Sequence, residues 1–175
     1  MYQANIQSLE EALAALAVAR SHLGGLVPDD VAAAAIAHNP DVFHLVGEQG
    51  ERSDRPAFLA YLPLNRRGAW ALVNQQFSGM RPDLTMVCGA DERPHAIYIW
   101  LIFAPGTFRA LAPLLGRLAP EGCPLFTRGV TGHTSRLFPA MGFVEARAAY
   151  PNAAADLLAL SPRSGFPVFE TEAVA

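Results

Sequence analysis

The chain has 175 residues, 51% of them hydrophobic, which suits one domain with one sizeable core over residues 1–175. Its formal net charge of −3 argues against sequence-independent nucleic-acid binding, which needs a basic face. All thirteen basic residues are arginine, so a lysine Schiff base is excluded and any anion clamp must use arginine, main-chain amides or hydroxyls.

The first part of the chain predicts two helices. Ser8 begins a capping-box pattern, and the Ala/Leu periodicity that follows runs to Leu23, where two glycines stop it. Pro28 is followed by two aspartates, a favourable helix start, and the second helix ends at Asn39 before a proline. We therefore expect an all-helical opening segment.

The amino-terminal residues and the apolar runs indicate the cellular compartment. Residues 1–11 have no cationic stretch ahead of an apolar one, so we expect no signal peptide. The most apolar run, Ala96–Ala104, is far shorter than the ~20 residues of a transmembrane helix. A cytoplasmic protein without membrane contact is the expectation, with Cys88 and Cys123 as buried thiols rather than a disulfide.

The middle of the chain predicts strands with one helix among them. Val42–Val46 and Pro56–Leu62 are β-prone runs joined by a polar, glycine-containing stretch, which indicates an antiparallel hairpin. Trp70–Phe77 is compatible with a short helix and Leu84–Cys88 with a strand. Ala96–Phe103, rich in Ile, Tyr, Trp and Phe, predicts a buried strand.

The remaining pattern alternates helices and strands. Leucines at helical spacing lead to Leu118, and a strand is expected at Pro124–Thr127. A helix over Thr131–Met141 is followed by extended chain from Phe143 onward. The whole order predicts an α+β fold with a partly parallel junction, the kind of place where open sheets bind ligands.

One segment carries a family resemblance. Residues 131–143 resemble the motif N-x-x-A-x-x-L-Y-x-x-x-G-F of the GNAT superfamily of N-acetyltransferases, with Leu137, Gly142 and Phe143 at matching positions. Phe138 stands where the family usually has tyrosine. With the upstream strand, turn and helix, the resemblance covers roughly residues 97–145.

This resemblance implies a GNAT-like fold, in which helices cover both faces of a central mixed, mostly antiparallel sheet. The amino-terminal helices and hairpin would take residues 1–90, the acyl-CoA half 91–150, and an extension 151–175. The strand ending at Phe103 would splay from the strand at Leu125, and the pantetheine arm of acetyl-CoA or another acyl-CoA co-substrate would lie between them. The residues implied in cofactor binding are Leu101, Ile102, Phe103, Gly106, Thr107, Arg109 and Phe138.

The sequence also departs from the family pattern. The stretch comparable to the phosphate loop, Gly106–Leu111, has one glycine where the family has more, and bulky residues where main chain must approach phosphate. Phe138 has no hydroxyl, so it cannot protonate a departing thiolate. Pro113 and Pro139 each fall in a predicted helix. Pro113 leaves the start of the first helix open between Thr107 and about Leu111, and Pro139 is expected to kink the second or end it early.

Three residues are candidates for proton transfer. His133 lies in the first turn of the last predicted helix, and Tyr98 and His95 lie at the start of the strand ending at Phe103. Each also has a plain structural reading: an exposed helix-start histidine, a core-edge aromatic and a turn residue. No metal is expected, because the histidines and cysteines lack metal-ligand spacing.

The leading hypothesis is an acyl-CoA-dependent N-acyltransferase in which a bound amine attacks the thioester directly. Two alternatives stay open: a GNAT-like domain that binds a ligand without catalysis, and an acyltransferase whose donor is an acyl carrier protein. The expected partner is a small-molecule or protein amine acceptor, with no nucleic acid and no membrane. The residues leave the identity of this acceptor and the existence of a homodimer open.

Overall fold

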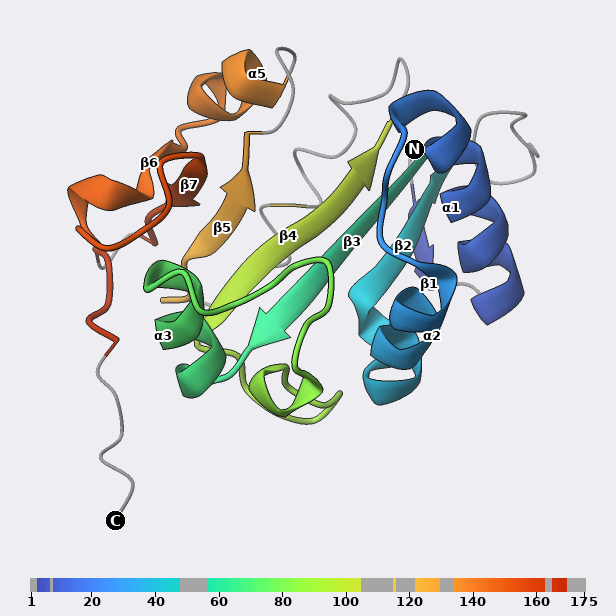
Figure 1. Cartoon of the computed structure of the whole chain (residues 1–175), viewed down its shortest axis with the longest axis horizontal. Coiled ribbons are helices and arrows are strands. Elements are labelled where there is room, and N and C mark those ends of the chain that lie inside the picture. The colour runs from blue at the N-terminus through green and yellow to red at the C-terminus, as the bar shows by residue number, and fades with distance from the viewer. Residues whose placement is uncertain are drawn as a thin grey trace.

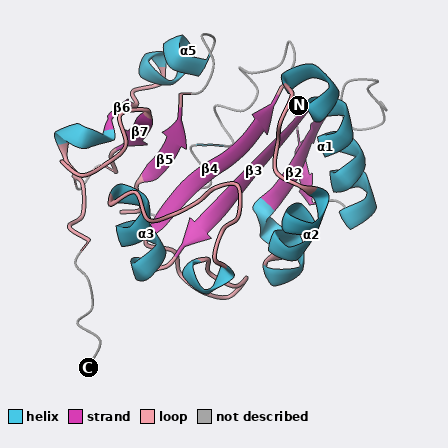
Figure 2. Ribbon diagram, viewed as in Figure 1, coloured by secondary structure: helices cyan, strands magenta, loops and turns pink. Residues whose placement is uncertain are grey.

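The computed structural model describes residues 3–6, 8–47, 57–104, 115, 122–129, 134–162 and 165–169. These residues form a seven-stranded sheet in the order β1-β2-β3-β4-β5-β7-β6 (Figure 1). The strands are β1 Gln3–Ile6, β2 Phe43–Gly47, β3 Ala57–Leu64, β4 Ala96–Phe103, β5 Leu125–Arg128, β6 Val144–Glu145 and β7 Leu157–Leu160. The described α-helices are α1 Leu9–Leu23, α2 Asp29–His38, α3 Arg66–Val73 and α5 Thr134–Ala140 (Figure 2).

Among these strands, one neighbouring pair is parallel and the others are antiparallel. β1 to β4 form an antiparallel meander, β4 and β5 are parallel, and β7 lies antiparallel between β5 and β6. The expected α+β class, with a mixed and mostly antiparallel sheet, is confirmed. The strand order follows the sequence up to β5 and departs from it where β7 lies between β5 and β6.

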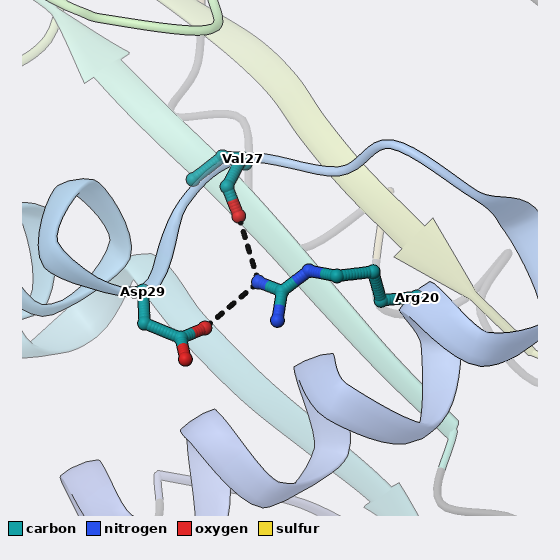
Figure 3. Close-up of polar contacts among 3 residues, drawn as sticks. All are labelled: Arg20, Val27 and Asp29. Atoms are coloured by element: carbon teal, nitrogen blue, oxygen red, sulfur yellow. Dashed lines mark hydrogen bonds and ion pairs between the residues drawn. The ribbon is translucent and has the colours of Figure 1, made fainter.

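The helical opening segment follows the predicted boundaries. Ser8 caps α1, its Oγ accepting from the Glu11 amide at 3.4 Å. Figure 3 shows how the turn after α1 is fixed: Arg20 donates to the Val27 carbonyl at 2.9 Å and to the Asp29 carboxylate at 2.7 Å. Since Asp29 begins α2, this arginine ties the end of one helix to the start of the next.

The two faces of the sheet carry separate hydrophobic clusters. Along β3, Phe58 and Leu62 face one cluster and Leu59 faces the other, as strand alternation requires. The first cluster includes residues of α1, α2 and α3; in Figure 1, α1 and α2 lie together at the right of the sheet and α3 lies apart from them at the left. The second includes Leu115 and, from α5, Phe138. Helices therefore cover both faces.

Several predicted elements need correction. The helix predicted at Trp70–Phe77 is α3, which begins at Arg66 because Asn65 accepts from the Gly68 amide and caps it. The strand predicted at Leu84–Cys88 is wrong, since residues 84–86 form a 3₁₀ turn and the next residue makes an isolated bridge. β1 and β7 were not predicted, and the extended chain from Phe143 includes only the two residues of β6 before a 3₁₀ turn.

Other expectations are met. The hairpin is β2 and β3, and the strand Ala96–Phe103 has the predicted boundaries. α5 contains Pro139 and ends at the following residue, as expected for an early end. Both cysteines are free and buried, and burial raises the pKa of Cys88 and of Cys123 to about 11.

Candidate functional site

The parallel pairing of β4 and β5 is confined to the start of the two strands. Cα partners are Ile97 with Leu125 and Tyr98 with Phe126, and the described residues of these strands form no later pair. β4 nevertheless continues to Phe103 and stays paired with β3. Figure 1 shows the two arrows diverging beyond their paired ends. Past Tyr98, the β5-facing edge of β4 therefore presents main-chain groups with which no described strand pairs.

An irregularity in β4 lies where the two strands part. Ala60 of β3 pairs with Leu101, whereas the next β3 residue, Tyr61, pairs with Ile99. Trp100 is therefore an extra residue on β4 and forms a β-bulge, a feature that re-aims side chains and interrupts pairing. Trp100 and Leu101 consequently both pack against the first hydrophobic cluster.

The segment after α3 lies against this part of β4. The Trp100 indole N–H donates to the Gly79 carbonyl. A Cβ added to Gly79 would lie 3.2 Å from the Tyr98 hydroxyl, so the phenol reaches the same residue. The Tyr98 ring also meets the edge of Phe77, with centroids 5.9 Å apart. Two β4 side chains and the segment 77–79 thus enclose one side of the parting strands.

The Tyr98 hydroxyl lies beside an ion pair. Arg128, at the end of β5, donates to both carboxylate oxygens of Asp156 at 3.1 and 3.0 Å. Burial raises the pKa of Tyr98, while the charge and hydrogen bonding of Arg128 lower it and Asp156 raises it. Since burial is the largest effect, the phenol keeps its proton at neutral pH. The arrangement offers a protonated hydroxyl and a held guanidinium next to the opening.

The structure does not bring His95, another predicted proton-transfer residue, to this place. His95 is exposed and directly precedes β4, at the end opposite Phe103. Tyr98, where the pairing with β5 ends, is three residues further along, ~10 Å at about 3.3 Å per residue. His133 lies outside the described residues. Of the two described residues of the predicted catalytic set, Tyr98 lies where β4 and β5 separate and His95 does not.

The predicted cofactor-binding residues divide into three groups. Leu101 and Phe103 pack against the first cluster and Ile102 against the second, all on the part of β4 that β5 does not pair with. Phe138 is 1% exposed and packs on Phe143 with ring centroids 5.2 Å apart, so it is a core residue. Gly106, Thr107 and Arg109 lie outside the described residues.

Sequence reasoning missed a buried histidine on β2. His44 is 8% exposed and its ring stacks on Tyr61, with centroids 5.3 Å apart. Its Nε2 is buried without a hydrogen-bond partner among the described residues. Burial lowers the pKa of His44, so the ring is neutral at neutral pH, and burial raises the pKa of Tyr61 to about 12. No motif marks this pair, because it depends on the register of β2 against β3.

No family model matches the chain, and no curated protein matches it. Within the described ranges, no group of three or more His, Cys, Asp or Glu side chains could hold a metal ion. None of the described helices is long and apolar enough to cross a membrane.

Proposed function

We propose that the chain is a GNAT-like N-acyltransferase that takes an acyl group, acetyl in the simplest case, from acyl-CoA and passes it to an amine. The observation that carries this proposal is the early end of the β4–β5 ladder, after Tyr98 and Phe126. A splayed pair of parallel strands at this position is what the resemblance of residues 97–145 implies.

The open edge of β4 suits an extended arm that contains amides. Paired strands lie about 4.8 Å apart, so an arm inserted between two strands requires them to separate to roughly twice that distance. Pantetheine has two amide groups, and an extended chain beside a free strand edge gains main-chain hydrogen bonds in the manner of an added strand. The residues beyond Tyr98 on β4 provide such an edge.

The reaction needs two proton transfers around one bond exchange. The neutral amine attacks the thioester carbon, the new C–N bond forms, and the C–S bond breaks to release the CoA thiolate. The amine loses a proton to solvent or a base, and the thiolate gains one. In this proposal Tyr98 supplies that second proton, because its buried phenol stays protonated and Phe138 has no hydroxyl.

Calorimetry with acetyl-CoA tests the binding step. We expect saturable one-to-one binding, with competition from free pantetheine because the arm itself occupies the opening. Mass spectrometry of an amine panel incubated with acetyl-CoA then tests transfer. Absence of saturable binding by acetyl-CoA and by longer acyl-CoAs would contradict the proposal.

A domain that binds the same kind of ligand without turning it over is the second candidate. Phe138 favours it, since the position of the family's usual tyrosine is filled by a core side chain that is 1% exposed. Binding of acetyl-CoA without transfer to any amine in the panel would support this candidate. Binding of an acyl carrier protein in place of acyl-CoA, measured by pull-down, would instead support the carrier-protein donor.

A further inference from the structure

A hollow lined by arginines lies at the end of β4 opposite Phe103. Two adjoining pockets of about 360 Å³ each share Arg66, Arg93 and His95. The first also touches residues 122–123 before β5 and the segment 167–169, and the second touches Arg67 and Glu92. Elements far apart in sequence thus build one concave, cationic surface.

The charge of this surface opposes that of the whole protein. Among the described lining residues, three are arginines, Arg66, Arg67 and Arg93, which stand with His95 against one carboxylate, Glu92. That carboxylate accepts from the Gly89 amide at 3.1 Å, so it also serves the turn before β4. The chain carries a net charge of −3, and a concave site of the opposite sign concentrates the field for an anion.

The start of α3 differs in charge from the starts of α1 and α2. α1 and α2 place acidic residues in their first turns, where the helix dipole favours negative charge. α3 has no acid in its first turn and begins with Arg66 and Arg67. This placement disfavours the helix by itself, and local rules are broken in this way mainly where a site requires it.

We propose that this hollow, the arginine pocket, binds the phosphate group of a small molecule. Guanidinium forks match phosphate oxygens in geometry and stay charged at every physiological pH, and arginine is the only long cation available to this chain. The pocket volume falls at the lower end of the range for small-molecule sites, about 300–1,000 Å³. The pocket residues Arg93 and His95 lie before the amino end of β4, whereas the opening proposed for acyl-CoA begins beyond Tyr98.

The test uses the full chain and inorganic phosphate as the probe. The chain is titrated with phosphate, and NMR follows the backbone amides and arginine side chains. Chloride keeps the ionic strength constant during the titration. A panel of phosphorylated metabolites is then tested in the same way. Arg67→Gln and Arg93→Gln each remove one pocket charge from an exposed side chain. Arg81→Gln removes the same charge from an exposed arginine outside the pocket.

We expect saturable shifts at residues 65–67 and 92–95, at least tenfold weaker binding in Arg67→Gln and Arg93→Gln, and unchanged binding in Arg81→Gln. Calorimetry with acetyl-CoA should give the same affinity in all three variants, which separates this site from the proposed acyl-CoA site. No saturable shift, shifts that map elsewhere, or equal weakening in Arg81→Gln would overturn the proposal.

Discussion

The two edges of β4 differ in how completely they are paired. Toward β3, the strand is paired from Ala96 to Phe103, interrupted only by the bulge at Trp100. Toward β5, the pairing comprises the positions of Ile97 and Tyr98. The β3 edge is ordinary sheet interior, in which the main-chain groups are satisfied by a neighbouring strand. The β5 edge leaves such groups available to something other than a described strand.

This difference assigns separate roles to the two sides of one strand. Changes on the β3 side should cost folding free energy, because they disturb buried contacts in the meander. Removal of a polar group beside the β5 edge should cost chemistry and leave stability nearly unchanged, because the buried packing around that group is kept. The following variants test this division, in order of decreasing effect.

Removing the Tyr98 hydroxyl should have the largest effect. Tyr98→Phe keeps the buried ring beside Phe77 and deletes the proposed proton donor. Because a positioned acid or base contributes about 10²–10⁴-fold, we expect kcat with the best amine of the panel to fall by that factor. Affinity for acetyl-CoA, measured by calorimetry, should stay within about twofold, since only the transition state loses an interaction.

Tyr150→Phe is the matched control for this variant. Tyr150 is another buried tyrosine of the first cluster, and its hydroxyl donates to the Pro167 carbonyl at 2.8 Å, away from the opening. It should lose about 1 kcal/mol of stability and keep its kcat. Equal losses of kcat in both variants would mean that the hydroxyl of Tyr98 has only a structural role.

Truncating a core residue on β3 should have the largest effect on stability. Phe58 is fully buried between Phe43 and Phe103, with centroid distances of 4.9 and 6.0 Å. Phe58→Ala should lower the free energy of unfolding by about 3–5 kcal/mol in urea denaturation. Leu23→Ala, at a side chain that is 51% exposed, should change it by less than about 1 kcal/mol. Similar losses of stability in Phe58→Ala and Leu23→Ala would show that the β3 side of β4 is not a well-packed interior.

A substitution at Gly68 tests how closely α3, in the connection from β3 to β4, packs on the chain near Met86. A Cβ at Gly68 in α3 would collide with the main-chain carbonyl oxygen of Met86, whereas a Cβ at Gly89 meets nothing within 4 Å. Gly68→Ala should therefore destabilise the fold by about 1–3 kcal/mol through overpacking, and Gly89→Ala should not. Thermal unfolding of the two variants measures the difference. A stable Gly68→Ala protein would contradict the close packing of α3.

The smallest expected effect is a pH dependence on the β2–β3 side. Burial lowers the pKa of His44 in the native protein below its ordinary value of 6.5. In the pH window between the native pKa and 6.5, the unfolded chain therefore binds a proton that the native protein does not. Stability then rises with pH in this window, is complete above pH 6.5 and is lost as the pH falls below it. Between pH 7.5 and pH 5.5, urea denaturation should show a larger loss for the natural chain than for His44→Gln. Equal losses would remove His44 as the cause.

The sequence predicted those parts of the fold that local chemistry determines. The run Ala96–Phe103 is dense in β-branched and aromatic residues, and Ser8 with the acids after it marks the start of α1. Leu84–Cys88 looks equally apolar, yet the Asp83 carboxylate accepts from the Thr85 amide at 3.0 Å and turns the chain into a 3₁₀ helix. A capping interaction of this kind overrides the β-propensity of a short run.

The candidate site was predictable only in part. Tyr98 could be named because it lies on the most evident strand of the chain. Arg128 and Asp156 are 28 residues apart, and they meet because β7, which has no clear pattern, pairs with β5 in a register that places Arg128 opposite Leu157. The Arg66–Arg93 grouping likewise arises from tertiary packing of α3 against the turn before β4.

A crystal structure of the chain with coenzyme A tests the central claim most directly. We expect density for the pantetheine arm between β4 beyond Tyr98 and β5 beyond Phe126, with its amides hydrogen-bonded to the main chain of β4. Density for coenzyme A at another place, or a β4–β5 ladder that continues to the ends of both strands, would contradict the account.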